Sequence, residues 1–202
     1  MKIFVITFIL FSIGCSTFKK QPVPLDLKHW DSKAVIKDLM NDKTHTVDIE
    51  VFKNGEQMLR LEISALMGVS VASVVINQQE IGYSLNRQSQ FFQGKVNEDS
   101  FQYLMNIPLH PFALIAAIEH RNLKQYGWQC SIQNGVIEQC LYPKQNLTVK
   151  YLKIDHIKSK VQIYGPQFEM NWLLSRSTTE VQNMTELFRI KAPEGFKIIQ
   201  IN

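Results

Sequence analysis

The sequence lacks most of the features that mark an enzyme or a metalloprotein. Its five histidines are scattered, without a His-x-His or His-Glu-x-x-His spacing that would place two metal ligands on one face. There is no glycine-rich phosphate loop, and the partial nucleophile motif at residues 68–72 lacks its second glycine and the strand-to-helix context. We therefore expect a protein that is not an enzyme and that carries neither a metal nor another cofactor.

The chain also lacks a concentrated stripe of positive charge. Lys and Arg total 22 against 18 Asp and Glu, which gives a formal net charge of +4 and a pI near 8.9. These residues are scattered, apart from a short cluster between Lys153 and Lys160. A nucleic-acid surface usually needs a concentrated basic stripe, so we expect no nucleic-acid partner. Mild attraction to anionic membranes stays open.

Long apolar runs are scarce, and the first of them lies at the N-terminus. Lys2 precedes an apolar run from Ile3 to Ile13, which is too short for a spanning helix of about 20 residues and indicates a secretion signal. Gly14 and Cys15 then follow, as in a bacterial lipoprotein signal, where the cysteine is acylated and becomes the mature N-terminus. Ser12 departs from that pattern, in which leucine is more frequent. The alternative is an ordinary cleaved signal with an incidental cysteine.

The residues after Cys15 suggest where the protein is located. Ser16 is not Asp, which in the lipoprotein sorting rule implied by this resemblance favours the outer membrane. The next residues contain lysines and prolines, as in a tether. We expect a lipoprotein signal peptide over residues 1–14, a lipidated N-terminus and tether over residues 15–28, and one domain over residues 29–202, on the periplasmic face of the outer membrane.

Beyond His45 most of the chain alternates apolar and polar residues with the period of two typical of β-strands. The Asn-Gly pairs at residues 54–55 and 134–135 are hairpin signals between such segments. The segment from Val69 to Ile76 is apolar on both faces, which predicts a central strand covered on both sides. About ten or eleven strands follow one another, too many for a flat sheet, so we expect a curved antiparallel meander.

Helical spacing is confined to the start and the middle of the domain. Asp31 and Ser32 can cap a first helix that runs to Met40. Residues 99–105 also have helical spacing, and they lead into Pro108–Ile118, which is apolar all round and has prolines suited to a first turn. A helix that is apolar all round must be covered on more than one side. We expect it to lie against or inside the curved sheet, in a container for an apolar ligand.

Four segments together resemble the Lol-type lipoprotein carrier and receptor family, and the outer-membrane-anchored receptor more than the soluble carrier. They are the lipoprotein signal ending at Cys15, the strand–break–strand segment Leu59–Asn77, the helical segment Phe101–Ile118 and the closing strand around Pro193–Phe196. The resemblance implies a mainly β fold with helices, an open antiparallel half-barrel in which the helices cover an apolar cavity for lipoprotein acyl chains.

One departure from the family pattern concerns a loop. The family's receptor has a protruding apolar loop between early strands that helps to insert lipoproteins into the membrane. The connection Lys53–Glu56 in this sequence is tight and polar. If the strands correspond, the loop is absent here, and insertion by that route is not expected.

The resulting hypothesis is an outer-membrane lipoprotein, palmitate-modified at Cys15, that binds lipid or lipoprotein acyl chains. It would act as a lipid-binding chaperone in transport, accepting lipoproteins for localisation to the outer membrane. Its partners would be acylated lipoproteins or lipids and a soluble periplasmic lipoprotein carrier. The alternative is a non-catalytic structural or assembly lipoprotein with a filled core, which binds protein partners. The candidate lining residues, each of which could equally be ordinary core, are Leu61, Ile63, Val71, Val75, Tyr83, Phe112, Ile115, Trp128 and Trp172.

Cys130 and Cys140 are the two cysteines left if Cys15 is acylated, and an exported protein favours a disulfide between them. The register of the hairpin opposes it. A two-residue turn at residues 134–135 places Cys130 opposite Gln139, so that the cysteines point to opposite faces. One extra loop residue, or a bulge next to the glycine, would bring them opposite each other. Both alternatives stay open.

Overall fold

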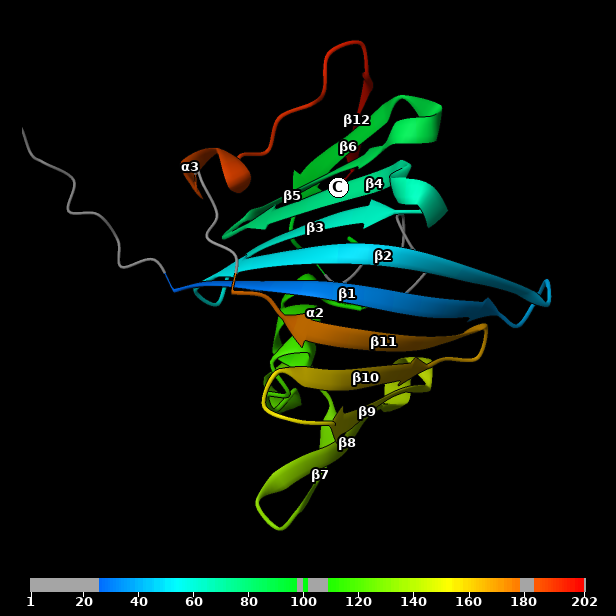
Figure 1. Ribbon diagram of the computed structural model, residues 1–202, viewed down its shortest axis with the longest axis vertical. Coiled ribbons are helices and arrows are strands. Elements are labelled where there is room, and N and C mark those ends of the chain that lie inside the picture. The colour runs from blue at the N-terminus through cyan, green and yellow to red at the C-terminus, as the bar shows by residue number, and fades with distance from the viewer. Residues whose placement is uncertain (1–25, 98–99, 102–108, 179–183, 202) are drawn as a thin grey trace, which may run out of the picture.

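The computed structural model describes residues 26–97, 100–101, 109–178 and 184–201. These residues form one open sheet of 12 strands in the order β12-β6-β5-β4-β3-β2-β1-β11-β10-β9-β8-β7 (Figure 1). All neighbouring strands are antiparallel except β6 and β12, which are parallel. The strands are β1 (Leu27–Asp38), β2 (Lys43–Asn54), β3 (Met58–Ser64), β4 (Ser70–Asn77), β5 (Glu80–Leu85), β6 (Gln90–Lys95), β7 (Gln129–Gln133), β8 (Val136–Tyr142), β9 (Leu147–Lys153), β10 (Lys158–Tyr164), β11 (Phe168–Arg176) and β12 (Lys197–Ile201).

The predicted open, mainly β sheet is confirmed, and it does not close into a barrel. Two α-helices accompany the strands within the described residues, α2 (Pro111–Ile118) and α3 (Met184–Leu187). In the part of the chain that the structure covers, no helix is long and apolar enough to span a membrane. Pro108 and most of the helical segment expected over residues 99–105 lie outside the described residues.

The strand β1 corrects the prediction of a first helix from Asp31 to Met40. This segment is a central strand, which pairs with β2 along one edge and with β11 along the other. Trp30 and Ala34 are buried while charged residues between them are exposed. A spacing of four residues fits one face of a helix and one face of a strand alike. Pairing on both edges, which is tertiary structure, selected the strand.

One side of the sheet, which we call the inner face, carries the main core. Along the cross-strand register, Trp30 lies opposite Val51, Val51 opposite Leu61, and Leu61 opposite Val74. All four side chains are buried. Directly opposed residues of antiparallel strands share a face, so the same register continues from β11 to β8 and produces an apolar surface that spans the sheet.

The helix α2 packs against this inner face. Figure 1 shows it behind strands β1 and β11. Pro111 occupies the first turn, and the Nδ1 atom of His110 accepts a hydrogen bond of 3.2 Å from the backbone N–H of Phe112. Every residue of α2 except Phe112 is buried, and Phe112 packs against the same core. The expectation of an apolar helix lying against the sheet is therefore confirmed.

The opposite side, the outer face, is covered locally by the segment before β12. Arg60 donates a hydrogen bond of 2.9 Å from Nη1 to the backbone oxygen of Leu187. A Cβ atom at Gly82 would lie 2.6 Å from Cγ2 of Ile190, so glycine at this position lets the segment lie against β5. Val75 is buried there, and Ile76 is buried on the inner face. Both faces of the C-terminal half of β4 are covered, as the sequence predicted.

Candidate functional site

Most of the predicted lining residues meet in the main core. Five of them are buried side chains of that core, and two more are partly buried and pack against it. The buried members are Leu61, Tyr83, Ile115, Trp128 and Trp172, and the partly buried members are Ile63 and Phe112. They come from the sheet, from α2 and from the segment just before β7, so residues far apart in the sequence line one apolar interior.

Val71 and Val75 are corrections to the predicted lining. Both lie on the outer face, where Val75 is opposite Gly82 in β5. Val71 is 37% exposed to solvent there. The residues of β4 that face inward are Ala72, Val74 and Ile76. Because β4 is apolar at successive positions, its sequence does not show which alternate set points to the core.

The helix α2 fills the apolar interior. Its alanines at positions 113, 116 and 117 are fully buried, as is Ile115. Seven of the eight residues of α2 are buried in this interior, so an apolar ligand that takes their place requires α2 to move.

Glu119, the residue directly after α2, ties the helix to the sheet through buried ion pairs. Its Oε1 atom lies 2.8 Å from Nζ of Lys28 and 2.9 Å from Nζ of Lys53, and its Oε2 atom lies 2.9 Å from Nε of Arg121. The Lys53 side chain is only 3% exposed and the Glu119 side chain 11%. Arg121 also contacts Glu56, at 3.0 Å. We call Glu119, Lys28, Lys53 and Arg121 the Glu119 cluster.

The charges of the Glu119 cluster shift the protonation equilibria of its members. Burial alone raises the pKa of Glu119, but the hydrogen bonds and charges of Lys28 and Lys53 outweigh it and hold this pKa below its ordinary value. The hydrogen bond to Glu119 raises the pKa of Lys28, against the opposing effect of its own burial. Both members are therefore ionised at neutral pH. Sequence reasoning missed this cluster, since an alternating strand pattern does not predict inward-facing lysines.

A cleft of about 320 Å³ opens beside the Glu119 cluster, at the end of the sheet where β1 begins; we call it the basic cleft. Trp30 and Ile118 contribute apolar walls. The other lining residues that matter here are charged or titratable, and they come from β1, from the end of α2, from the β9–β10 turn and from the end of β11. They are Lys28, Glu119, His120, Lys153, Asp155, His156, Lys158 and Arg176.

His120 lies in the basic cleft with a buried polar atom. Its Nε2 atom has no hydrogen-bond partner among the residues that the structure describes, and neither does the Oη atom of Tyr151, whose ring lies 5.0 Å from the His120 ring. Burial lowers the pKa of His120, and the positive charge of Lys153 lowers it further, so the imidazole is neutral at pH 7. Burial also raises the pKa of Tyr151.

The outer face holds one group of side chains with the chemistry of a cation site. His29, Asp31 and Glu50 each place a ligand atom within 4.8 Å of the others, and Nε2 of His29 lies 3.6 Å from Oδ1 of Asp31. The His29 ring stacks on Phe52 with centroids 4.4 Å apart. Residues of this kind could accept a divalent cation. No spacing in the sequence signals this group, because it forms only when β1 pairs with β2.

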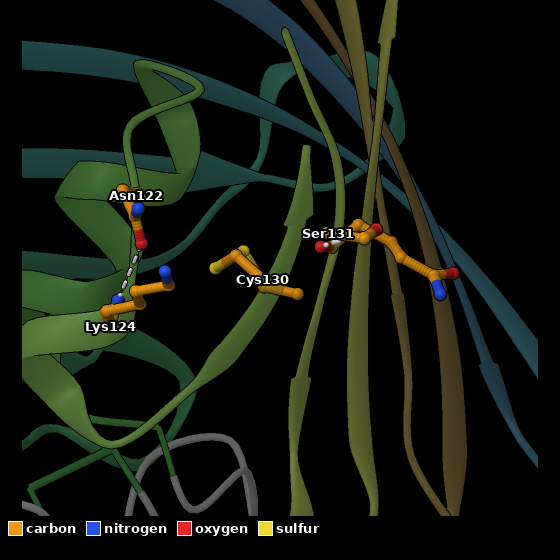
Figure 2. The surroundings of a disulfide bond; sticks show 6 residues. Asn122, Lys124, Cys130 and Ser131 are labelled. Carbon is orange, nitrogen blue, oxygen red and sulfur yellow. Dashed lines mark hydrogen bonds between the residues drawn. A yellow bond between two sulfur atoms is a disulfide. The ribbon is translucent and has the colours of Figure 1, made fainter. Parts of the chain in front are cut away.

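Cys130 and Cys140 lie opposite each other in β7 and β8 and form a disulfide, whose surroundings Figure 2 shows. The two-residue turn at 134–135 is kept, since Ile132 still pairs with Ile137. A bulge beyond this pair then shifts the register by one residue. Tight turn and disulfide thus coexist, because the bulge lies inside the hairpin rather than at its loop.

The connection between β3 and β4 carries exposed apolar side chains, and we call it the apolar loop. Leu66, Met67 and Val69 are 69%, 99% and 63% exposed. Positive φ angles at Met67 and Gly68, 67° and 74°, shape the turn that presents them. We expected no such loop because the connection at residues 53–56 is polar. That connection, between β2 and β3, is indeed tight, but the apolar loop lies one strand later.

Comparison with known proteins gave structural likenesses alone. No protein-family model and no curated protein matches the chain. A LolA superfamily protein from Nitrosomonas europaea is 9% identical with a TM-score of 0.46, covering 83% of this chain and 91% of its own. A DUF1329 family protein from Desulfovibrio piger is 10% identical with a TM-score of 0.46, covering 82% and 90%. An uncharacterized conserved protein from Thermus thermophilus is 9% identical with a TM-score of 0.35, covering 86% and 90%. At these identities and TM-scores the likenesses assign the chain to no family.

Proposed function

We propose that the protein binds the acyl chains of lipids or lipoproteins on its inner face, and that α2 occupies the acyl site when no ligand is bound. The observation that carries this proposal is the position of α2, an apolar helix buried in the interior of an open sheet. A sheet that does not close can admit a ligand at its ends without breaking a strand pair. The function so proposed is carriage, with no catalytic step.

The energies of helix and ligand are comparable, which makes such an exchange feasible. An acyl chain of about 14 methylenes gains about 11 kcal/mol on full transfer from water to the interior, at about 0.8 kcal/mol each. Exposing Leu114, Ile115 and Ile118 costs about 1.5–3 kcal/mol for each side chain. All three are buried in the structure. The gain from burying an acyl chain is therefore of the same order as the burial that α2 loses.

The Glu119 cluster supplies the latch in this proposal. Glu119 fixes the C-terminal end of α2 to β1 and β2 through Lys28 and Lys53. Release of α2 requires these ion pairs to separate, and the partly exposed Lys28 can follow the carboxylate more easily than the buried Lys53. The latch would keep the apolar helix in place until a ligand competes for the interior.

The apolar loop gives the proposed carrier a contact with the membrane. Leu66, Met67 and Val69 are exposed together, and exposed apolar groups of this kind mark interaction sites. We infer that the loop enters the lipid surface when cargo is passed to or from the membrane. This replaces the expectation that insertion by such a loop is not available to the protein.

We further propose that Cys15 carries the lipid that anchors the protein to the periplasmic face of the outer membrane. The support is the sequence pattern that ends at Gly14 and Cys15, both outside the described residues. Acylated lipoproteins are the proposed cargo, received from a soluble periplasmic lipoprotein carrier. Substituting Cys15→Ala should move the protein from the membrane to the soluble fraction; if it still sediments after a salt wash, the lipid is not the main attachment.

A second candidate function follows if the interior is a filled core. With α2 in place, the interior needs no ligand, as expected of a structural or assembly lipoprotein that binds protein partners through its surface. In that case the helix would be a permanent part of the core. The two functions differ in whether α2 moves.

Uptake of an acylated peptide tests the proposed function. The domain over residues 26–202, which lacks the anchor, is mixed with a palmitoylated peptide and with the same peptide unmodified, and adducts are measured by native mass spectrometry. We expect a one-to-one adduct with the palmitoylated peptide alone. Glu119→Gln should accelerate uptake by weakening the latch, whereas Glu186→Gln, in an exposed ion pair with Arg189, should not. Absence of any adduct would favour the structural function.

A further inference from the structure

The basic cleft has more positive than negative charge, and its carboxylates already have partners. The carboxylate of Asp155 accepts hydrogen bonds of 2.7 and 2.6 Å from the backbone N–H groups of Ile157 and Lys158. Glu119 is held by its own cluster, which includes Lys28. Asp155 keeps its charge and acts electrostatically on Lys158 without forming an ion pair, but the basic cleft holds more cations than these two acids can neutralise.

The remaining cations of the basic cleft form no ion pair with a carboxylate of the described residues. Lys153, Lys158 and Arg176 form no ion pair with any carboxylate that the structure describes, although all three line the basic cleft. Their charges act on their neighbours, since Lys153 lowers the pKa of His120 and Arg176 opposes the rise in the pKa of Lys28. An anion in the basic cleft would relieve this repulsion.

A phosphate group fits these donors. Lysine binds phosphate as a point charge and arginine can bind it through two N–H groups. His120 also lines the basic cleft, and it can add a hydrogen bond when its ring turns the buried Nε2 atom toward the ligand. At about 320 Å³ the basic cleft has room for several groups of the size of a water, each of which takes about 30 Å³ in the liquid, so it can hold a phosphate with its ester substituent.

The walls of the basic cleft favour a lipid as the source of the phosphate. Trp30 and Ile118 line it and also belong to the main core, so the basic cleft adjoins the inner face. Ile154 and Ile157, in the β9–β10 turn beside it, are exposed. The described chain also begins at this end. About 11 residues separate its first residue from Cys15, and a segment of that length spans at most about 40 Å.

We infer that the basic cleft binds the phosphate group of an acylated lipid, while the acyl chains of that lipid extend onto the inner face. Lys153, Lys158 and Arg176 contact the phosphate oxygens. The lipid part of this inference rests on the acyl-binding function proposed above, whereas binding of a phosphate group alone does not. The ligand class is narrowed from any acylated molecule to an acylated phosphate ester.

The test compares ligands that differ only in the phosphate or only in the acyl chains. The full-length chain, in an uncharged detergent, is titrated with phosphatidylglycerol, with diacylglycerol of the same chains and with glycerol phosphate. Lipid adducts are followed by native mass spectrometry and glycerol phosphate by phosphorus NMR. We expect phosphatidylglycerol to bind at least tenfold more tightly than either of the other two.

Two pairs of substitutions locate the binding to the basic cleft. The double substitution Lys153→Gln with Arg176→Gln should weaken the binding of phosphatidylglycerol at least tenfold. It should weaken the binding of diacylglycerol less than twofold. The matched control, Lys33→Gln with Lys37→Gln, removes two exposed lysines of β1 and should change neither. Lys158→Gln alone should act in the same direction as the first pair and provides a reading if that pair fails to fold.

Each other result contradicts the inference in a different way. Equal binding of phosphatidylglycerol and diacylglycerol overturns it and leaves the acyl-binding function standing. Binding of glycerol phosphate without either lipid overturns both the lipid assignment and the acyl-binding function, and identifies free phosphate as the ligand of the basic cleft. If the two pairs of substitutions weaken the binding of phosphatidylglycerol equally, the lipid is attracted to positive charge without specificity. That result overturns the inference as well.

Discussion

At the scale of single residues, Glu119 makes the ion pairs that hold α2 against the sheet. Its carboxylate contacts three cations, and one of these, Lys53, is almost wholly buried on the inner face. A lysine in such a position is stable only while its charge is compensated. Removing the carboxylate therefore costs more than the ion pairs alone contribute, because it leaves the Lys53 side chain buried without its partner.

We predict that Glu119→Gln lowers the free energy of unfolding by about 3–5 kcal/mol, the range expected when one partner of a buried ion pair is removed. Glu186→Gln should lower it by less than about 1 kcal/mol, because the pair of Glu186 with Arg189 is exposed. Urea denaturation followed by circular dichroism measures both. Similar losses in the two variants would show that the Glu119 cluster does not secure the fold.

The same residue predicts a dependence of stability on pH. The pKa of Glu119 in the folded protein is below its ordinary value of 4.5, so the folded state favours the ionised form. The stability that Glu119 contributes is complete above pH 4.5 and is lost as the pH falls through the lower pKa of the folded state. Thermal unfolding between about pH 7 and pH 3 should therefore show the wild-type protein and Glu119→Gln converging at the acid end. A constant difference would contradict this assignment.

Single residues also show where the sequence was informative and where it was not. The apolar character of Ile115 and Trp172 predicted correctly that they join the core. The sequence did not place Val71 or Val75, because β4 is apolar on both faces. It did not reveal Lys53 as an inward residue either, since the carboxylate that makes its burial tolerable follows much later in the chain, at Glu119 after a helix.

At the scale of elements, local pattern identified most strands and failed where tertiary contacts decide. The Asn-Gly turns and the strands around them were predictable from alternation and turn chemistry. The segment Leu27–Asp38 was not, because its apolar spacing fits helix and strand alike until β2 and β11 pair with it. The sequence suggested a bulge only next to the turn, whereas in the structure two residue pairs separate the bulge from the turn.

The β7–β8 hairpin gives a prediction about the disulfide. Replacing both Cys130 and Cys140 with serine should lower the free energy of unfolding by roughly 2–3 kcal/mol in the chain-entropy model, because the bond closes a short loop. Intact mass after thiol alkylation, with and without reductant, tests for the bond in the folded protein. Two alkylated cysteines before reduction would mean that the hairpin folds without it.

At the scale of the whole molecule, the sheet has two different ends. The apolar loop follows the end of β3, where Ser64 pairs with Asp48 of β2, on the side of the sheet toward which β1 runs. The basic cleft lies at the opposite end, where β1 begins. The open sheet between them carries α2 on its inner face. An apolar contact at one end and a charged cleft at the other suit a carrier that meets both a membrane and a polar headgroup.

The apolar loop supplies a prediction at this scale. Met67→Glu should reduce binding of the unanchored domain to phospholipid vesicles at least about tenfold, because one large apolar side chain contributes about 1.5–3 kcal/mol when it leaves water. Val136→Glu, at another exposed apolar position, in the β7–β8 hairpin, is the control and should leave binding unchanged. Sedimentation with vesicles measures both. An equal effect of the two substitutions would remove the apolar loop from the proposal.

The central claim is that an acyl chain takes the place of α2, and amide hydrogen exchange of this helix tests it most directly. Exchange is measured over residues 112–118 in the domain alone and in the domain saturated with a palmitoylated peptide, with β1 as the internal reference. We predict that saturation accelerates exchange in α2 by at least about tenfold and leaves β1 unchanged, because the displaced helix loses its buried contacts. If α2 stays as protected as β1 in the saturated domain, the acyl chain does not displace the helix and the account is wrong.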